Sequence, residues 1–230
     1  MPTILAIETS TELASVALLH GDRLLVRDAP SVQTHSQTLL PMVQALLAQA
    51  GIPLKACDAI AFGAGPGSFT GVRTACGVVQ GLAFGAGLPV APVVTLEAMA
   101  QACHEQTGAA DVLCLLDARM GEVYWAQYRH GEAGWQIVVA PALCSPAAVA
   151  PQGEAVACGN GLAAYPEAFS GRPLLSGAHP GIMPHAAQVA TLARLAVMRG
   201  ETIEAAAAQP VYLRNKVALT TAERMAEKVA

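Results

Sequence analysis

Residues 3–19 have the sequence TILAIETSTELASVALL, in which two short apolar segments flank a polar turn at residues 8–12. Apolar runs of this length on either side of a polar turn are typical of two antiparallel strands. Gly21 and Asp22 then predict a second turn, which leads into a third strand over residues 24–27. The stretch therefore predicts an antiparallel meander with an acidic residue, Glu8, in its first hairpin.

The next eighty residues predict helices that alternate with buried strands. Residues 36–50 predict a helix because their leucines and Val43 recur on one face, and Gly51 is placed to terminate it. The remaining predicted elements of this half are a buried strand over residues 58–62, a glycine-rich loop over 63–73, a helix from that loop to about residue 84, and a strand over 88–94.

The second half of the chain repeats the plan of the first more loosely. An offset of 109 residues places Glu8 on Asp117, and strands are predicted over residues 112–116, 122–128 and 135–139. A repeated βββαβα unit with an acid in its first hairpin predicts an α/β protein of the actin-like ATPase (ribonuclease H-like) fold. A chance likeness between two β-hairpins is the alternative.

The two predicted lobes divide the chain at a polar, glycine-containing stretch over residues 103–110. We expect an N-terminal lobe over residues 1–104 and a C-terminal lobe over residues 105–230, whose last segment is free to pack back on the first lobe.

Composition and charge predict a cytoplasmic protein that does not hold nucleic acid on its own. The 230 residues include 13 Lys and Arg against 17 Asp and Glu, so the net charge is −4 and no basic excess is present to neutralise phosphates. Six cysteines without a C-x-x-C spacing predict reduced apolar side chains. The first residues lack a basic region, and glycines and prolines interrupt the uncharged run between Arg73 and Glu97, so we expect neither a signal peptide nor a membrane span.

Five segments, spread in order over nearly the whole chain, together resemble the TsaB family. They are ILAIETST (4–11), HSQTLLP (35–41), GPGSFTGVRTA (65–75), LDARMGEVYWA (116–126) and PVYLR (210–214). The resemblance implies a non-catalytic scaffold or activator that binds TsaD, the enzyme that transfers threonylcarbamoyl to adenosine 37 of tRNA, with the ATPase TsaE as a third component. It also implies that tRNA is reached only through that complex.

The chain lacks the residue pair that would make it a copy of the catalytic subunit. In TsaD, two histidines four residues apart hold a metal, whereas His35 here is followed by Leu39 at that spacing. Because a catalytic metal ion usually has three or more protein ligands, we expect no metal site and no catalytic residue. The alternative from another class is an independent actin-like ATPase or kinase, or a peptidase.

The two predicted hairpins mark a candidate nucleotide cleft. Glu8, Thr9, Ser10 and Asp117 occupy the places where actin-like ATPases hold phosphate and magnesium. Arg119, however, stands where a glycine would allow close approach of a phosphate. We therefore expect no cofactor, and ATP or ADP binding stays open.

The glycine-rich loop carries neither of the catalytic motifs that it suggests. A phosphate-binding loop of the Walker type needs a lysine, and a hydrolase elbow needs glycines where Pro66 and Thr70 stand. We expect instead a tight turn in which Ser68 or Thr70 caps the following helix. Arg73, near the start of that helix, opposes the helix dipole, which predicts an acidic partner or a bound anion.

The predicted helices of the first half are unusually free of charge, which favours a partner-binding surface. No charged residue occurs between Asp28 and Lys55, and Gly77, Gly81 and Gly85 repeat at every fourth position. The alternative is that both helices are buried inside the monomer, with the glycines on the sheet. The resemblance favours contact with TsaD in a heterodimer, or with a second copy in a homodimer when TsaD is missing. The candidate contact residues are His35, Leu39, Leu40, Val43, Gln44, Leu47, Phe69, Arg73, Gly77 and Gly81.

Overall fold

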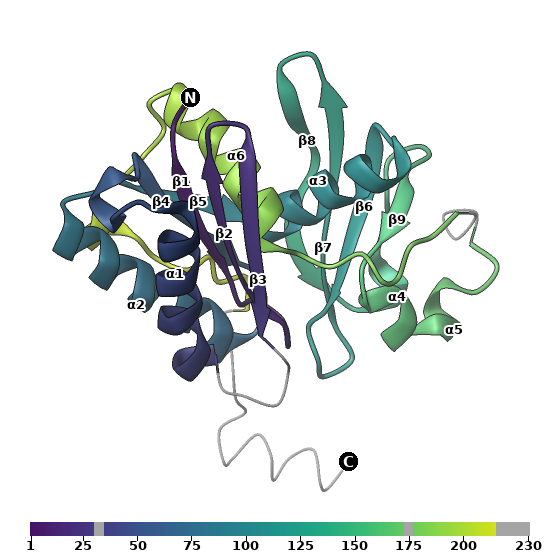
Figure 1. Ribbon diagram of the computed structural model, residues 1–230. Coiled ribbons are helices and arrows are strands. Elements are labelled where there is room, and N and C mark those ends of the chain that lie inside the picture. The colour runs from purple at the N-terminus through teal and green to yellow at the C-terminus, as the bar shows by residue number, and fades with distance from the viewer. Residues whose placement is uncertain (30–34, 173–176, 215–230) are drawn as a thin grey trace, which may run out of the picture.

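The computed structural model describes residues 1–29, 35–172 and 177–214, which form two β-sheets and the helices around them (Figure 1). The first sheet has the strand order β3-β2-β1-β4-β5. Its first three strands form the predicted antiparallel meander, and β4 and β5 join parallel to β1. The five strands are β1 (Ile4–Glu8), β2 (Ala14–His20), β3 (Arg23–Ala29), β4 (Ala59–Gly65) and β5 (Val90–Val94).

The second sheet repeats this order with four strands, β8-β7-β6-β9. As in the first sheet, three antiparallel strands are followed by one that is parallel to the first of them. A short 3-10 helix, Pro146–Ala148, lies between β8 and β9, where the first repeat has a long helix. The repeated order confirms the predicted actin-like, ribonuclease H-like α/β fold. The strands are β6 (Asp111–Asp117), β7 (Val123–Gly131), β8 (Gly134–Cys144) and β9 (Val156–Cys158).

Helices on both faces enclose the first sheet. Alternate residues of its strands face opposite sides, so Leu5 and Ile7 pack towards α1 (His35–Ala50) and α2 (Phe69–Ala86). Ile4 and Ala6 of the same strand pack towards α6 (Ala186–Met198) on the other face.

Helices α3 and α6 lie between the two sheets and cross over between the repeats. Helix α3 (Thr95–Thr107), which follows β5, packs on the second sheet, whereas α6 packs on the first. The other face of the second sheet is covered by α4 (Gly161–Ala164) and α5 (Pro166–Phe169). The division at residues 103–110 stays a prediction, and the exchanged helices show that each sheet draws its core from both halves of the chain.

Strand β8 differs most from its predicted bounds, since it continues past residue 139 to Cys144. Pro141 interrupts the sequence pattern of a strand because it lacks an N–H group for the ladder. Strand β8 lies at the edge of its sheet, where a missing donor is tolerated, and the pairing with β7 shifts register between Trp125 and Gln127. Two further 3-10 helices are Leu54–Ala56 and Ala205–Ala207. None of the helices in the described ranges has the length and hydropathy needed to cross a bilayer.

Candidate functional site

The glycine-rich loop after β4 is pressed against the first hairpin. A Cβ atom at Gly71 would lie 1.9 Å from the carbonyl oxygen of Thr9, and one at Gly67 would lie 2.5 Å from that of Ser10. Only glycine allows this approach. Two hydrogen bonds hold it, from Ser68 N to Ser10 O (2.7 Å) and from Thr9 Oγ1 to Gly71 O (2.8 Å). The loop therefore packs on the first hairpin, a contact that was not predicted from the sequence.

Glu8 is fully buried beside β4 at Gly63. Its Oε1 accepts a hydrogen bond from Ser10 N, and a Cβ atom at Gly63 would lie 1.8 Å from its Oε2. Among the described residues, neither Glu8 Oε2 nor Ser10 Oγ has a hydrogen-bond partner. Burial raises the pKa of Glu8, and the hydrogen bond from Ser10 N opposes that rise. The carboxyl group thus belongs to the packed interior of the lobe.

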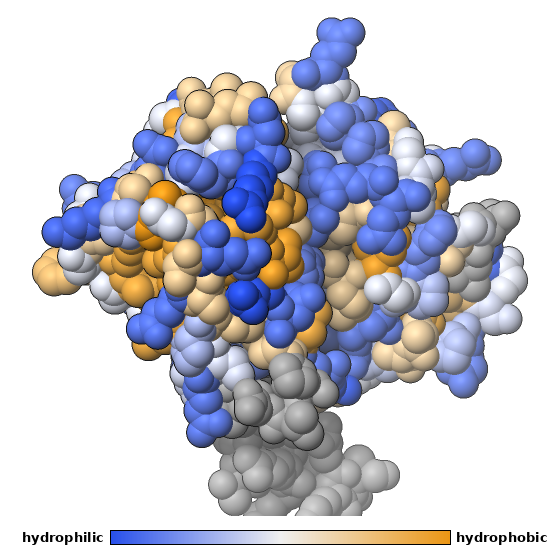
Figure 2. All heavy atoms as spheres, viewed as in Figure 1, coloured by the Kyte–Doolittle hydropathy of each residue, from blue (hydrophilic) through white to orange (hydrophobic). Residues whose placement is uncertain are grey.

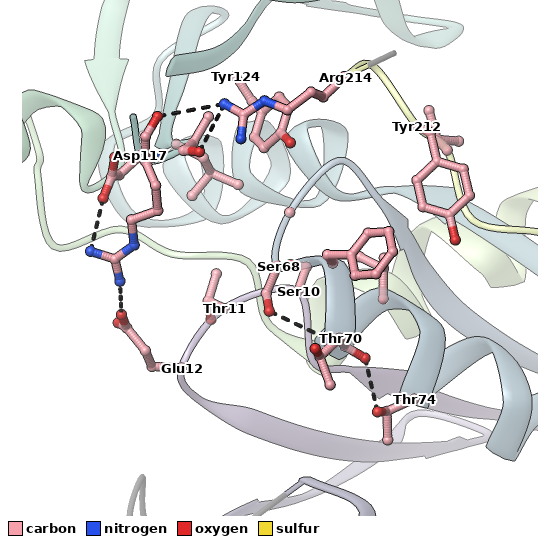
Figure 3. Close-up of a pocket in the computed structure, with 18 of the residues that line it drawn as sticks. Ser10, Thr11, Glu12, Ser68, Thr70, Thr74, Asp117, Tyr124, Tyr212 and Arg214 are labelled. Carbon is pink, nitrogen blue, oxygen red and sulfur yellow. Dashed lines mark hydrogen bonds and ion pairs between the residues drawn. The ribbon is translucent and has the colours of Figure 1, made fainter. Parts of the chain in front are cut away.

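A pocket of about 610 Å³ lies between the two lobes (Figure 3). Its walls are the first hairpin, the start of α2, the β6–β7 turn, and residues 211–214, which run across from one lobe to the other. Ser10 and Asp117 of the predicted nucleotide cleft line the pocket, whereas Glu8 and Thr9 are buried and do not. The assignment of Glu8 to the cleft is therefore wrong, because β4 at Gly63 covers its carboxyl group.

Arg119 of the β6–β7 turn spans this pocket. Its guanidinium pairs with Glu12 of the first hairpin at 2.6 Å and with Asp117 at 3.2 Å. Asp117 also accepts hydrogen bonds from Arg119 N (2.8 Å) and Tyr165 Oη (2.9 Å). The acid that would hold a magnesium ion is thus already engaged, and the position expected to be a glycine links the two hairpins instead.

Residues 208–214, which we call the strap, contact both lobes and form a second link between them, besides the Arg119–Glu12 ion pair. Val211 N donates to Ala64 O of β4 at 2.7 Å, and Arg214 pairs with Glu122 and donates to Ala118 O at 3.1 Å. The sequence leaves the last segment of the C-terminal lobe free to pack back on the first lobe, and Val211 lies against β4 there. Nothing in the composition of this segment indicates its second link, to the β6–β7 turn.

No described group of residues has the make-up of a metal centre. Within residues 1–29, 35–172 and 177–214, no three His, Cys, Asp or Glu side chains lie together as ligands. His35 begins α1, and its Nε2 lies 3.2 Å from the carbonyl oxygen of Glu12.

Helices α1 and α2 present a second candidate site, an outer surface without acidic residues, which we call the α1–α2 face. Figure 2 shows apolar residues gathered on the side of the molecule where these helices lie. A Cβ atom at Gly77, Gly81 or Gly85 would have no other atom within 4 Å, so these glycines do not pack on the sheet. The alternative of burial within the monomer is thereby excluded for them.

The predicted contact set separates into exposed and buried members. Leu40 is 45% exposed and Gln44 is exposed, while His35 and Leu47 are partly buried. Leu39 and Val43 need correction, because they lie in the core against the sheet and are out of a partner's reach. The members on α2, namely Phe69, Arg73, Gly77 and Gly81, are all exposed.

Phe84 was missed by sequence reasoning, although it is 83% exposed on α2. Its place three residues after Gly81 and one before Gly85 is the signal that would have found it, because residues three apart share a helix face. A phenylalanine so exposed beside three open glycines adds a large apolar group to the face.

The two local predictions for the start of α2 have different outcomes. Ser68 is confirmed as the cap, since its Oγ accepts from Gly71 N at 3.3 Å. For Arg73, no carboxylate among the described residues lies within ion-pair distance. Its guanidinium instead lies over the ring of Phe69, at 3.7 Å from the ring centroid, and its Nε donates to Tyr212 Oη at 2.7 Å.

Comparison with known proteins gives concordant matches. The model of the family TsaD, tRNA N6-adenosine threonylcarbamoyltransferase, matches residues 30–226. The tRNA threonylcarbamoyladenosine biosynthesis protein TsaB is 40% identical in Haemophilus influenzae (94% of each chain covered) and 41% identical in Escherichia coli (94% of this chain and 96% of the relative). A crystal structure of an uncharacterized protein with similarity to peptidase YeaZ from Pseudomonas aeruginosa is 44% identical, with a TM-score of 0.87 over 93% of this chain and all of that one.

Proposed function

Because the chain belongs to the TsaD family, among its TsaB-type proteins of tRNA threonylcarbamoyladenosine biosynthesis, we propose that it acts as a non-catalytic subunit that binds TsaD. In this role it stabilises or activates TsaD for transfer of the threonylcarbamoyl group to adenosine 37 of tRNA. TsaE joins the complex, and tRNA is bound by the complex and not by this chain alone.

The observation that carries the proposal is the α1–α2 face. A free surface helix normally carries charged residues on its outer side, yet α1 has none and α2 has only Arg73. Phe84, Phe69 and Leu40 are exposed on the same two helices. Depletion of charge together with exposed aromatic residues is typical of the buried centre of a protein interface.

The interlobe pocket supports a non-catalytic role. Arg119 occupies it with ion pairs to Glu12 and Asp117, and β4 at Gly63 covers the carboxyl group of Glu8. Asp117, the acid of the second hairpin, is engaged by Arg119 and by Tyr165 Oη. The proposed role therefore does not include nucleotide binding in this pocket. Cytoplasmic location is proposed only because it follows from the role in tRNA modification.

The second candidate is an independent enzyme, an ATPase or a peptidase. The peptidase is favoured by the Pseudomonas aeruginosa structure, which is described as similar to a peptidase. Ser68 is the serine of the loop, and its Oγ accepts from Gly71 N in the helix cap. Among the described residues no imidazole hydrogen-bonds to that hydroxyl, as a base that activates a serine would.

One set of assays separates these functions. Threonylcarbamoyl transfer to tRNA is measured with TsaD and TsaE, with and without the chain, and the complex with TsaD is identified by its mass. We expect transfer to depend on the chain, and the chain alone to turn over neither ATP nor peptides. Turnover by the purified chain that is lost on Ser68→Ala or Asp117→Asn would support the enzyme instead. If the chain alone forms a homodimer that dissociates when TsaD is added, the second copy and TsaD bind the same surface.

A further inference from the structure

The start of α2 holds a charged group that the proposed partner surface does not explain. Phe69, Arg73, Gly77 and Gly81 follow one another at every fourth position, so they form one row along the exposed side of the helix. Apart from Arg73, the row consists of Phe69 and two glycines. Arg73 is the fifth residue of α2, so it lies just beyond the first turn, in which the helix dipole acts most strongly.

Two aromatic rings hold Arg73 in one orientation. The guanidinium carbon lies 3.7 Å from the ring centroid of Phe69 and 5.4 Å from that of Tyr212, and the two rings are 6.1 Å apart. The hydrogen bond from Nε to Tyr212 Oη (2.7 Å) fixes the remaining rotation. Phe69 and Tyr212 are themselves 44% and 47% exposed, so this group of three stands at the surface, at the mouth of the interlobe pocket.

The arrangement leaves the two terminal nitrogens of Arg73 available. No hydrogen bond or ion pair within the described ranges uses Nη1 or Nη2, although the other arginines around the pocket, Arg119 and Arg214, pair with Glu12 and Glu122. Two parallel N–H groups on a fixed guanidinium match the two oxygens of a carboxylate. When a partner covers the α1–α2 face, this cation loses water and requires such an anion.

We propose that Arg73, held by Phe69 and Tyr212, is a carboxylate-binding anchor at the end of the α1–α2 face, and that an aspartate or glutamate side chain of the partner subunit pairs with it. The strap, through Tyr212, thereby becomes part of the partner surface. This inference rests on the proposed binding of TsaD to the face.

The test is the affinity of the chain for TsaD at two ionic strengths, about 0.05 and 0.5 M salt, because an ion pair formed on binding weakens as salt rises. Arg73→Gln is expected to weaken binding by about tenfold or more at low salt and to reduce its salt dependence. Tyr212→Phe keeps the ring and loses the hydrogen bond to Nε, so a smaller loss is expected, whereas Tyr212→Ala approaches the loss of Arg73→Gln. Gln106→Lys, on α3, serves as a control that changes the charge by one unit, with the opposite sign, away from the face.

Two results would overturn the inference. One is an Arg73→Gln variant that binds with the affinity and salt dependence of the wild type. The other is an Arg73→Gln variant whose loss of affinity is accompanied by the same salt dependence as the wild type, which would show that no ion pair forms at Arg73 on binding. Gly81→Lys distinguishes failure of the Arg73 anchor from failure of the whole α1–α2 face. If it abolishes binding while Arg73→Gln does not, only the anchor is wrong, and if neither affects binding, the proposed face is wrong as well.

Discussion

Two sets of three glycines in one continuous segment, residues 63–85, have opposite surroundings. In the inner set, Gly63, Gly67 and Gly71, a Cβ atom would lie 1.8–2.5 Å from atoms of Glu8, Ser10 and Thr9. In the outer set, Gly77, Gly81 and Gly85, it would meet nothing within 4 Å. The inner glycines are therefore required for the fold, while the outer ones contribute nothing to the packing of the monomer.

This difference decides between two explanations for a glycine in this segment, namely close packing within the monomer and contact with a partner. A glycine in the interior of a helix costs about 0.5–1 kcal/mol relative to alanine. Of the inner set, only Gly71 lies in a helix, and there the close approach of the first hairpin offsets the cost. The outer set has no such compensation within the described residues, which is why we assign its role to a partner.

The largest expected effect is on the inner set. Gly71→Ala places a methyl group against the carbonyl of Thr9, so the hairpin and α2 must move apart. We expect a loss of about 2–3 kcal/mol in the free energy of unfolding, or roughly 4–12 °C in melting temperature. Thermal or denaturant unfolding of the purified variant measures it. A variant as stable as the wild type would show that the close approach does not hold the hairpin.

Glu8, beneath the inner set, gives the next effect, and it depends on pH. Because burial raises its pKa in the folded state, the unfolded chain ionises first as pH rises through the ordinary carboxyl range. Stability is therefore greatest below that range and falls as pH rises towards the folded pKa. Glu8→Gln removes this fall. We expect its melting temperature to exceed that of the wild type at pH 7 and the difference to shrink towards pH 4, whereas a constant difference would contradict the buried, unpaired carboxyl group.

The smallest effect is expected on the outer set, with the same substitution as in the inner one. Gly77→Ala meets no atom and improves helix propensity, so the chain should gain about 0.5–1 kcal/mol, or roughly 1–4 °C. Measured beside Gly71→Ala, it is a matched control on the same helix. A destabilised Gly77→Ala chain would mean that the outer glycines are packed after all.

The sequence was sufficient for the fold class, the first sheet, three strands of the second and helices α1 and α2, but it did not predict α3, α6 or β9. The polar turn after Glu8, its counterpart at Asp117, and the alternation of strands and helices predict the repeated sheet, since these signals are local. The cap by Ser68 follows for the same reason. The Gly77, Gly81 and Gly85 spacing also placed these residues on one face of α2, but a helical period does not say whether that face points inwards or outwards.

The site was less predictable because its contacts join residues far apart in the chain. The pairing of Glu12 with Arg119 and of Arg73 with Tyr212 spans 107 and 139 positions. No local pattern marks such pairs. Leu39 and Val43 illustrate a different error, since apolar residues four apart are the usual signal of a core-facing stripe and were assigned to the partner surface.

The outer glycines provide the most direct measurement of the central claim, that the α1–α2 face binds TsaD. Gly81→Lys adds a charge where no atom of the monomer is near and replaces a helical glycine, so its melting temperature should equal or slightly exceed that of the wild type. In a desolvated interface the same lysine without a partner should weaken binding roughly 100-fold or more. The account predicts normal melting and no co-purification with TsaD, with Gln106→Lys binding normally. A Gly81→Lys chain that melts normally and binds TsaD with unchanged affinity would contradict it.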